Sequence, residues 1–201
     1  MAITSKLPSV LELFNWVGRL KKWNRDFFGD SLKAREKMEK EVFAGKYVRV
    51  TLEARGVHVY ERVYLRPGIS VIPITPDDHI LCVKEKDWNT GVTRTKLVSG
   101  YVNPGEEPMD CAKRELAEEI GVTAKRWTLL LCTNSEEATV QKSQHYFVAK
   151  GLIIGQGHQD SDEEIFGLVK LSFEEVRQAV CAGEFGSGST AFVLLKLTGR
   201  S

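Results

Sequence analysis

Apolar residues recur at helical spacing near the beginning of the chain. Ser9 and Glu12 form the capping box that typically opens a helix. A more charged stretch, roughly residues 32–43, indicates a second helix. We therefore expect residues 1–45 to form an N-terminal helical extension that packs against the rest of the molecule or against another subunit. The apolar positions of the first helix are Val10, Leu13, Phe14, Val17 and Leu20.

The spacing of apolar residues shortens to two after Lys46, which is typical of strands. The alternating segments 48–52 and 57–60 flank Arg55 and Gly56, and this arrangement predicts a β-hairpin. The later apolar runs predict a series of further strands. They cover residues 69–75, 80–83, 95–98, 127–132, 145–149 and 166–171.

The strongest helix signal lies in the middle of the chain, over residues 108–120. Proline suits the first turn of a helix, and Gly121 suits its end. Ser172 and Glu175 form a second capping box, and a short helix should follow near the C-terminus. Strands interrupted by single helices favour an α/β fold with a mixed sheet between helices. We expect residues 46–201 to form this domain.

The charge composition argues against several classes of ligand and location. Twenty-eight Lys and Arg face twenty-seven Asp and Glu, so the formal charge is +1, without the basic field expected of a nucleic-acid binder. No apolar run approaches the roughly 20 residues of a membrane span, and the first residues do not follow a secretory pattern. We expect a cytoplasmic protein with no nucleic-acid polymer and no membrane as partner.

Three acids of the predicted central helix, Glu115, Glu118 and Glu119, are spaced so that their carboxylates share one patch. Like charges at this spacing repel one another, so a cation should offset them. Mg²⁺ or Mn²⁺ suits carboxylate oxygens, because hard cations prefer oxygen ligands. The alternative is a solvated helix whose acids pair with neighbouring cations. Those cations are Lys113, Lys125 and Arg126.

The three acids belong to a longer pattern, G-x5-E-x7-R-E-U-x-E-E-x-G-U, in which U is an aliphatic residue. The chain fits every specified position of it. These positions are Gly100, Glu106, Arg114, Glu115, Leu116, Glu118, Glu119, Gly121 and Val122. The pattern is the Nudix box, and on this motif the chain resembles the Nudix hydrolases. The resemblance implies an α/β/α sandwich and hydrolysis of a nucleoside diphosphate linked to another moiety.

The same resemblance implies a role for several residues of the box. Glu115, Glu118 and Glu119 would be metal ligands, and a backbone carbonyl of Ser99 or Gly100 would complete the site. The metal ions would bridge the two phosphates, neutralise their growing charge and help to make hydroxide from water near pH 7. Mg²⁺ or Mn²⁺ is the expected cofactor.

Two further roles follow from the resemblance. Arg114 and Glu106 would form an ion pair that orients the ligands. Glu164 falls in a predicted loop where some relatives carry a catalytic base, although a solvated acidic turn would look the same. In other branches of the family a box acid, here Glu118 or Glu119, activates the water instead.

Several cations precede the box and are candidates for substrate binding. Lys84, Lys86, Arg94 and Lys96 cluster there and could hold phosphates, and solvated strand ends are the alternative. The segments around the box resemble the branch that hydrolyses ADP-ribose and nucleoside diphosphate sugars. This resemblance implies a small-molecule nucleoside diphosphate derivative as substrate and a homodimer as assembly. The resembling segments are 43–46, 66–71, 147–149, 162–164 and 182–184.

The chain departs from that branch at two positions. Lys96 begins the segment K-L-V-S-G where the branch tends to read E-L-P-A-G, so a cation replaces a carboxylate and one metal site would be altered. Ala138 stands where many ADP-ribose hydrolases carry a proline. The substrate therefore stays open between ADP-ribose and another nucleotide sugar.

Two alternative functions remain at this point. One is hydrolysis of nucleoside triphosphates or dinucleoside polyphosphates. The other is a non-catalytic nucleotide sensor that signals through the N-terminal helices. The intact box argues against the sensor, because a pure binding protein has no need of a patch of three carboxylates.

Overall fold

The computed structural model describes residues 38–55, 57–87, 90–136, 139–155, 165–185 and 187–199. The predicted first helix, from Ser9 until Gly29, lies outside these residues, as do Ala138 and Glu164. Within them, ten strands form one mixed sheet in the order β1-β2-β3-β9-β4-β5-β10, with β6 on β5, β7 on β4 and β8 on β9. The strands are β1 Met38–Ala44, β2 Val48–Arg55, β3 His58–Leu65, β4 Gly68–Ile74, β5 His79–Lys86, β6 Thr93–Lys96, β7 Val98–Tyr101, β8 Val122–Glu136, β9 Val140–Ile154 and β10 Ile165–Ser172.

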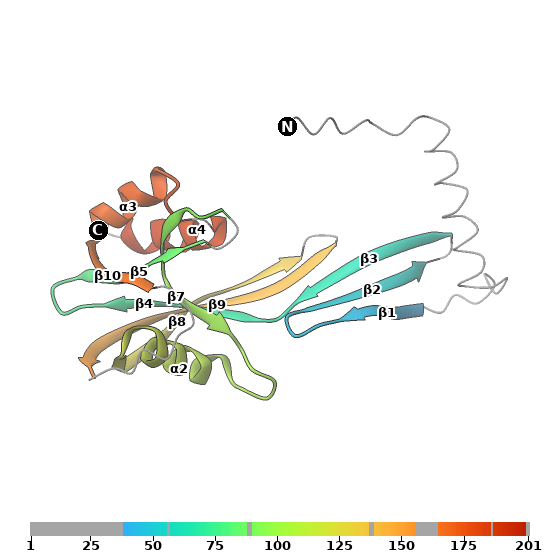
Figure 1. Ribbon diagram of the computed structural model, residues 1–201, viewed down its shortest axis with the longest axis horizontal. Coiled ribbons are helices and arrows are strands. Elements are labelled where there is room, and N and C mark those ends of the chain that lie inside the picture. Colours follow the sequence, from blue (N-terminus) through green and yellow to red (C-terminus); the bar gives the residue numbers. More distant parts are fainter. Residues whose placement is uncertain are drawn as a thin grey trace.

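Helices cover both faces of the sheet, as Figure 1 shows. Helix α2 (Pro108–Ile120) lies on one face, and α3 (Phe173–Cys181) and α4 (Gly188–Thr198) lie together on the other. Strands β1, β2 and β3 extend away from this body at one end. The predicted α/β fold with a mixed sheet between helices is therefore confirmed.

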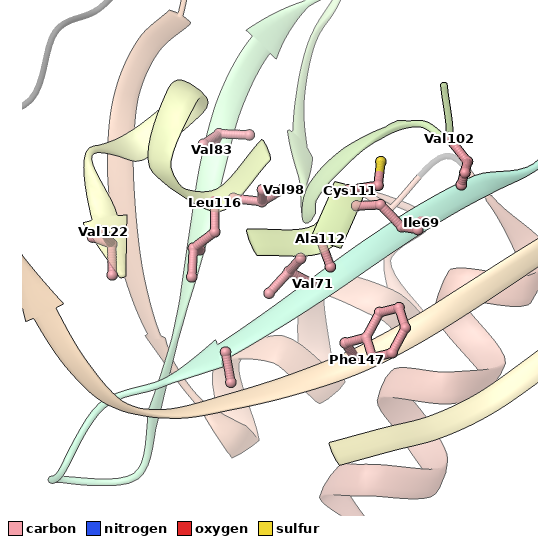
Figure 2. Close-up of a cluster of buried hydrophobic side chains, with 11 residues drawn as sticks. Ile69, Val71, Val83, Val98, Val102, Cys111, Ala112, Leu116, Val122 and Phe147 are labelled. Atoms are coloured by element: carbon pink, nitrogen blue, oxygen red, sulfur yellow. The ribbon is translucent and has the colours of Figure 1, made fainter. Parts of the chain in front are cut away.

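Strand β4 is central, and it separates the two hydrophobic cores. All seven of its residues are buried, and they alternate between the faces of the sheet. Ile69 and Val71 pack in the core beneath α2, whereas Ile72 and Ile74 pack in the core beneath α3 and α4. Figure 2 shows the first core, in which Leu116 of α2 lies among the side chains of the sheet.

Local signals predicted most elements correctly. Helix α2 has the predicted bounds, and Ser172 caps α3 in a complete capping box with Glu175. Strands β2 and β3 form the predicted hairpin, with Arg55 opposite His58. No helix within the described ranges has the length and apolar character to cross a membrane.

Two predictions were wrong in detail. The charged stretch at 32–43 was expected to be helical, but Met38–Ala44 is strand β1, paired antiparallel with β2. Pairing with β2 outweighs the helix propensity of its charged residues, and the Thr51 hydroxyl donates to Glu39 across it at 2.8 Å. The single strand expected at 95–98 is two, because the chain leaves β5 after Lys96 and joins β4 from Val98.

Leu116 should be a critical residue of the first core. It is fully buried among Val71, Val98 and Val122. We expect Leu116→Ala to lower the free energy of unfolding by about 2–5 kcal/mol, because the cavity cost adds to the lost burial. Urea unfolding followed by circular dichroism measures it. Leu195→Ala, at a position that is 40% exposed on α4, is the control and should cost much less; equal losses would contradict the packing described.

Candidate functional site

Helix α2 presents its acids because its opposite face is buried. It begins at Pro108, whose missing N–H costs nothing in the first turn. It ends at Gly121, whose φ of 64° lies in the left-handed region and whose N–H bonds back to Ala117 and Leu116. The buried side chains of the helix are Cys111, Ala112 and Leu116.

The Arg114 guanidinium holds three carboxylates together. Its Nε and Nη2 donate to Glu106 at 2.9 and 3.1 Å, the two-pronged geometry that strengthens such pairs. Its Nη1 donates to Glu115 at 2.7 Å and to Glu118 at 2.9 Å. The predicted pairing of Arg114 with Glu106 is thus present in the structure. These bonds raise the pKa of Arg114, and they lower that of Glu106 to about 2.

Glu115 lies against the backbone of β7. Its side chain is only 14% exposed, and burial raises the pKa of its carboxyl while Arg114 opposes that shift. Gly100 makes this approach possible, because a Cβ at position 100 would collide with the Glu115 carboxylate. A side chain at position 100 would therefore displace the Glu115 carboxylate from its place beside β7.

Glu119 is tied to the same strand. The backbone N–H of Ser99 donates to its carboxylate at 3.1 Å. Ser99 and Gly100, predicted to supply a backbone ligand, thus lie directly beside Glu119 and Glu115. Helix and strand come together here because β7 pairs with β4 in the register Ser99 to Ser70.

A cavity of about 660 Å³ opens above these groups and collects charges of both signs. The acids of α2 form one wall. Cations from four other segments, none of them in the box, face the same space. They are Lys46, Arg66, Lys96 and Lys142.

Three tyrosines line the same cavity, and the rings of two of them lie close together. Tyr47, which precedes β2, and Tyr101 of β7 have ring centroids 4.8 Å apart at an angle of 35°. Lys46 lies 5.0 Å from the Tyr47 ring centre and Arg66 lies 5.8 Å from it. Arg66 is held in place by bonds to Val102 O at 2.7 Å and to the Asn103 side chain at 2.9 Å.

The substrate-binding candidates are placed differently from one another. Lys96 lines the cavity and donates to Glu85 of β5 at 2.6 Å. Arg94 lines an adjoining smaller cavity. Lys84 is exposed on β5, and it lines neither cavity in the part of the chain that the structure describes. The role of each stays a prediction.

Sequence reasoning singled out Lys96 but missed the other cations outside the box that line the cavity, and its tyrosines. Lys46 and Arg66 fall in segments that resemble the ADP-ribose branch, but only the fold brings them to the acids. Arg66 carried one usable signal, since it stands before Pro67 and the wholly buried strand β4. Tyr47 and Lys142 carried none, because each is an ordinary surface residue of its own strand region.

The donor chemistry of the site suits a hard divalent cation. Three carboxylates and the adjacent backbone of β7 are the oxygen ligands that Mg²⁺ and Mn²⁺ prefer. Across the described ranges, no three acidic, His or Cys side chains converge into a ready metal cluster. In this structure Arg114 Nη1 instead donates hydrogen bonds to Glu115 and Glu118. The Glu118 side chain is 54% exposed, so it has room to reorient toward a metal ion.

The lowered pKa of Glu106 predicts how the free energy of unfolding depends on pH. A carboxylate whose pKa is lowered in the folded state stabilises the fold at pH values above its ordinary pKa, here 4.5. This stabilisation is lost as the pH falls through the folded-state pKa of about 2. The difference in unfolding free energy between the wild type and Glu106→Gln should therefore be largest above pH 5 and shrink toward pH 2. Urea unfolding at pH 6 and pH 3 measures it. A difference that does not change with pH would remove this ion pair from the acid response.

Comparison with protein-family models matches residues 64–186 to the NUDIX domain. The chain is 25% identical over 170 residues to the ADP-ribose pyrophosphatase of Bacillus subtilis (strain 168), covering 82% of this chain and 92% of that protein. It is 30% identical over 96 residues to the ADP compounds hydrolase NudE of Escherichia coli (strain K12), covering 47% of this chain and 51% of that one.

A solved structure shares the fold. It is the crystal structure of an ADP compounds hydrolase, with a TM-score of 0.67 and 24% identity, covering 84% of this chain and 100% of that chain. The match therefore covers much more of the chain than the box.

Proposed function

This chain belongs to the NUDIX family and is a Nudix pyrophosphohydrolase, and from that premise we propose that it hydrolyses a nucleoside diphosphate sugar, ADP-ribose among them, in a metal-dependent reaction. Water would attack one phosphorus, and the bridging oxygen would leave with the other phosphate. The products would be a nucleoside monophosphate and a phosphorylated sugar. The relationship to an ADP-ribose pyrophosphatase over most of both chains supports the choice of substrate class.

One observation carries this proposal. The three box carboxylates line the same cavity as a set of cations and the neighbouring tyrosines Tyr47 and Tyr101. Carboxylates suit a metal ion, cations suit phosphate oxygens, and aromatic rings suit a nucleobase. A cavity of about 660 Å³ is within the range that holds a small-molecule ligand.

Glu115, Glu118 and Glu119 would hold Mg²⁺ or Mn²⁺, with the backbone at Ser99 or Gly100 beside them. A divalent ion supplies charge neutralisation for the diphosphate and lowers the pKa of bound water. Arg114 positions Glu115 and Glu118 through its hydrogen bonds. It acts through these acids and thus counts as a positioning residue.

The far side of the cavity would bind the nucleotide. Arg66 and Lys46 lie beside the Tyr47 ring, so a base stacked on the Tyr47 and Tyr101 side would place its phosphates near cations. Lys142 adds another charge on this wall. The homodimer implied by the family resemblance and the cytoplasmic location expected from the sequence pattern stay predictions.

A substrate panel tests the proposal. Purified protein with Mg²⁺ or Mn²⁺ should release AMP and ribose 5-phosphate from ADP-ribose, and a nucleoside monophosphate from other nucleotide sugars, as resolved by anion-exchange chromatography. Chelator should abolish the reaction. Faster cleavage of nucleoside triphosphates or diadenosine polyphosphates would select that alternative, and binding of these compounds without cleavage would select a sensor.

Single isosteric substitutions of Glu by Gln should identify the catalytic base. Glu118→Gln and Glu119→Gln should each lower kcat by about a hundredfold or more without unfolding, because each loses a metal ligand or a base. Glu164→Gln should do the same if Glu164 takes the proton from water. Steady-state kinetics with ADP-ribose measures all three. A wild-type rate for Glu164→Gln would return the role of base to Glu118 or Glu119.

Glu107→Gln is the matched control. Glu107 is exposed at the start of α2, makes no side-chain cap and is absent from the lining of the cavity as described. Its kcat should stay within about twofold of the wild type, since it touches none of the groups named above. Loss of activity in this variant would mean that the charge of α2 as a whole, rather than the box acids, controls turnover.

A further inference from the structure

A second cavity of about 350 Å³ adjoins the first. The two cavities have five lining residues in common, so they lie side by side. The shared residues are Ser70, Lys96, Ser99, Ser187 and Thr190. The tyrosine rings and Arg66 line the first cavity and are absent from the second in the described part of the chain. The second cavity therefore adjoins the first on a side that these tyrosines and Arg66 do not line.

The second cavity begins next to the reaction centre. Ser99, in the shared wall, is the residue whose N–H donates to Glu119. A diphosphate held at the box acids would thus direct one of its substituents past Ser99 into this space. If the nucleoside occupies the side of the tyrosines, that substituent is the other half of the substrate.

The charges around the second cavity are balanced. Lys96 donates to Glu85 at 2.6 Å, with side chains only 34% and 25% exposed. Arg94 stands opposite Glu85 in the pairing of β5 and β6, and Asp87 lies at the end of the same hairpin. The second cavity is thus lined by two cations and one acid, Asp87, while Glu85, which lines only the first cavity, offsets the charge of Lys96.

Hydroxyl groups supply most of the remaining polar surface. Ser70 is 4% exposed and Thr95 is 6% exposed, and both line the second cavity. Thr190 and Ser187 reach the cavity from α4 and the residue before it. Leu97 and Phe185 provide the apolar part of the lining. Paired charges and hydroxyls can donate and accept together, which is what a neutral ring with several hydroxyls requires.

We propose that this second cavity is the subsite for the sugar of the nucleotide sugar, with the Lys96–Glu85 pair and Thr190 as residues that determine specificity. This inference rests on the proposed function. It also gives Lys96 a role in place of the carboxylate expected there. The cation binds sugar hydroxyls and is held in place by Glu85 from the neighbouring strand.

A truncated substrate separates the subsite from the reaction centre. We compare ADP-ribose and ADP-glucose with the methyl ester of ADP, which keeps the diphosphate linkage but has no sugar. In the wild type, kcat/KM for the better of the two ADP-sugars should exceed that for methyl ADP by at least about tenfold. Lys96→Met and Thr190→Val should each remove most of this advantage. Thr190→Val, which removes no charge, should also leave kcat/KM for methyl ADP within about twofold.

Lys86→Met is the matched control. Lys86 is an exposed lysine of β5 that lines neither cavity among the described residues, so its variant should keep the wild-type ratio. Thr190→Val conserves the shape of the side chain. It keeps the proposal testable if Lys96→Met destabilises the fold, which circular dichroism would detect.

Each other outcome is decisive. Equal losses on ADP-sugars and methyl ADP would place Lys96 at the reaction centre and overturn the subsite. A wild type that cleaves methyl ADP as well as both sugars would also overturn it. Preference for diadenosine diphosphate would assign the cavity to a second nucleoside. No cleavage of any of these compounds would instead mean that the proposed function itself has failed.

Discussion

The site depends on the hydrogen bonds that Arg114 donates to three carboxylates. Glu106, Glu115 and Glu118 converge on one guanidinium at 2.7–3.1 Å, and without that cation their charges would repel one another. A lysine could not replace it, because only the planar fork of arginine bonds several carboxylates in fixed directions. Since Glu106 lies in the loop before α2, the same contact ties that loop to the helix.

A second constraint is the close contact between α2 and β7. Gly100 leaves the space that the Glu115 carboxylate fills, and Ser99 bonds Glu119 through its backbone. This contact needs β7 to pair with β4, which happens because the chain changes partner strand at Leu97. The change of partner also leaves Lys96 on β6 beside Glu85, at the wall between the two cavities. One irregularity in the sheet thus positions both the reaction centre and the cavity beside it.

The expected elements and the observed ones differ where contacts are distant in sequence. The charged residues of Met38–Ala44 satisfy a helical pattern by themselves, yet they form β1 because β2 offers a backbone partner. In the same way, a single apolar run around residue 97 cannot show that its two halves pair with different strands. Local pattern predicts that a residue is extended or helical, but the choice of partner depends on the whole sheet.

The sequence by itself determined what depends on near neighbours. The bounds of α2, the cap at Ser172 and the shared face of Glu115, Glu118 and Glu119 all follow from residues within four positions of one another. Tertiary structure alone decided which cations and rings meet those acids. Arg66 and Lys142 are separated from them by tens of residues, and Lys96 finds Glu85 eleven residues away across two strands. The order and register of the strands determine these contacts, and no local spacing of residues encodes that order or register.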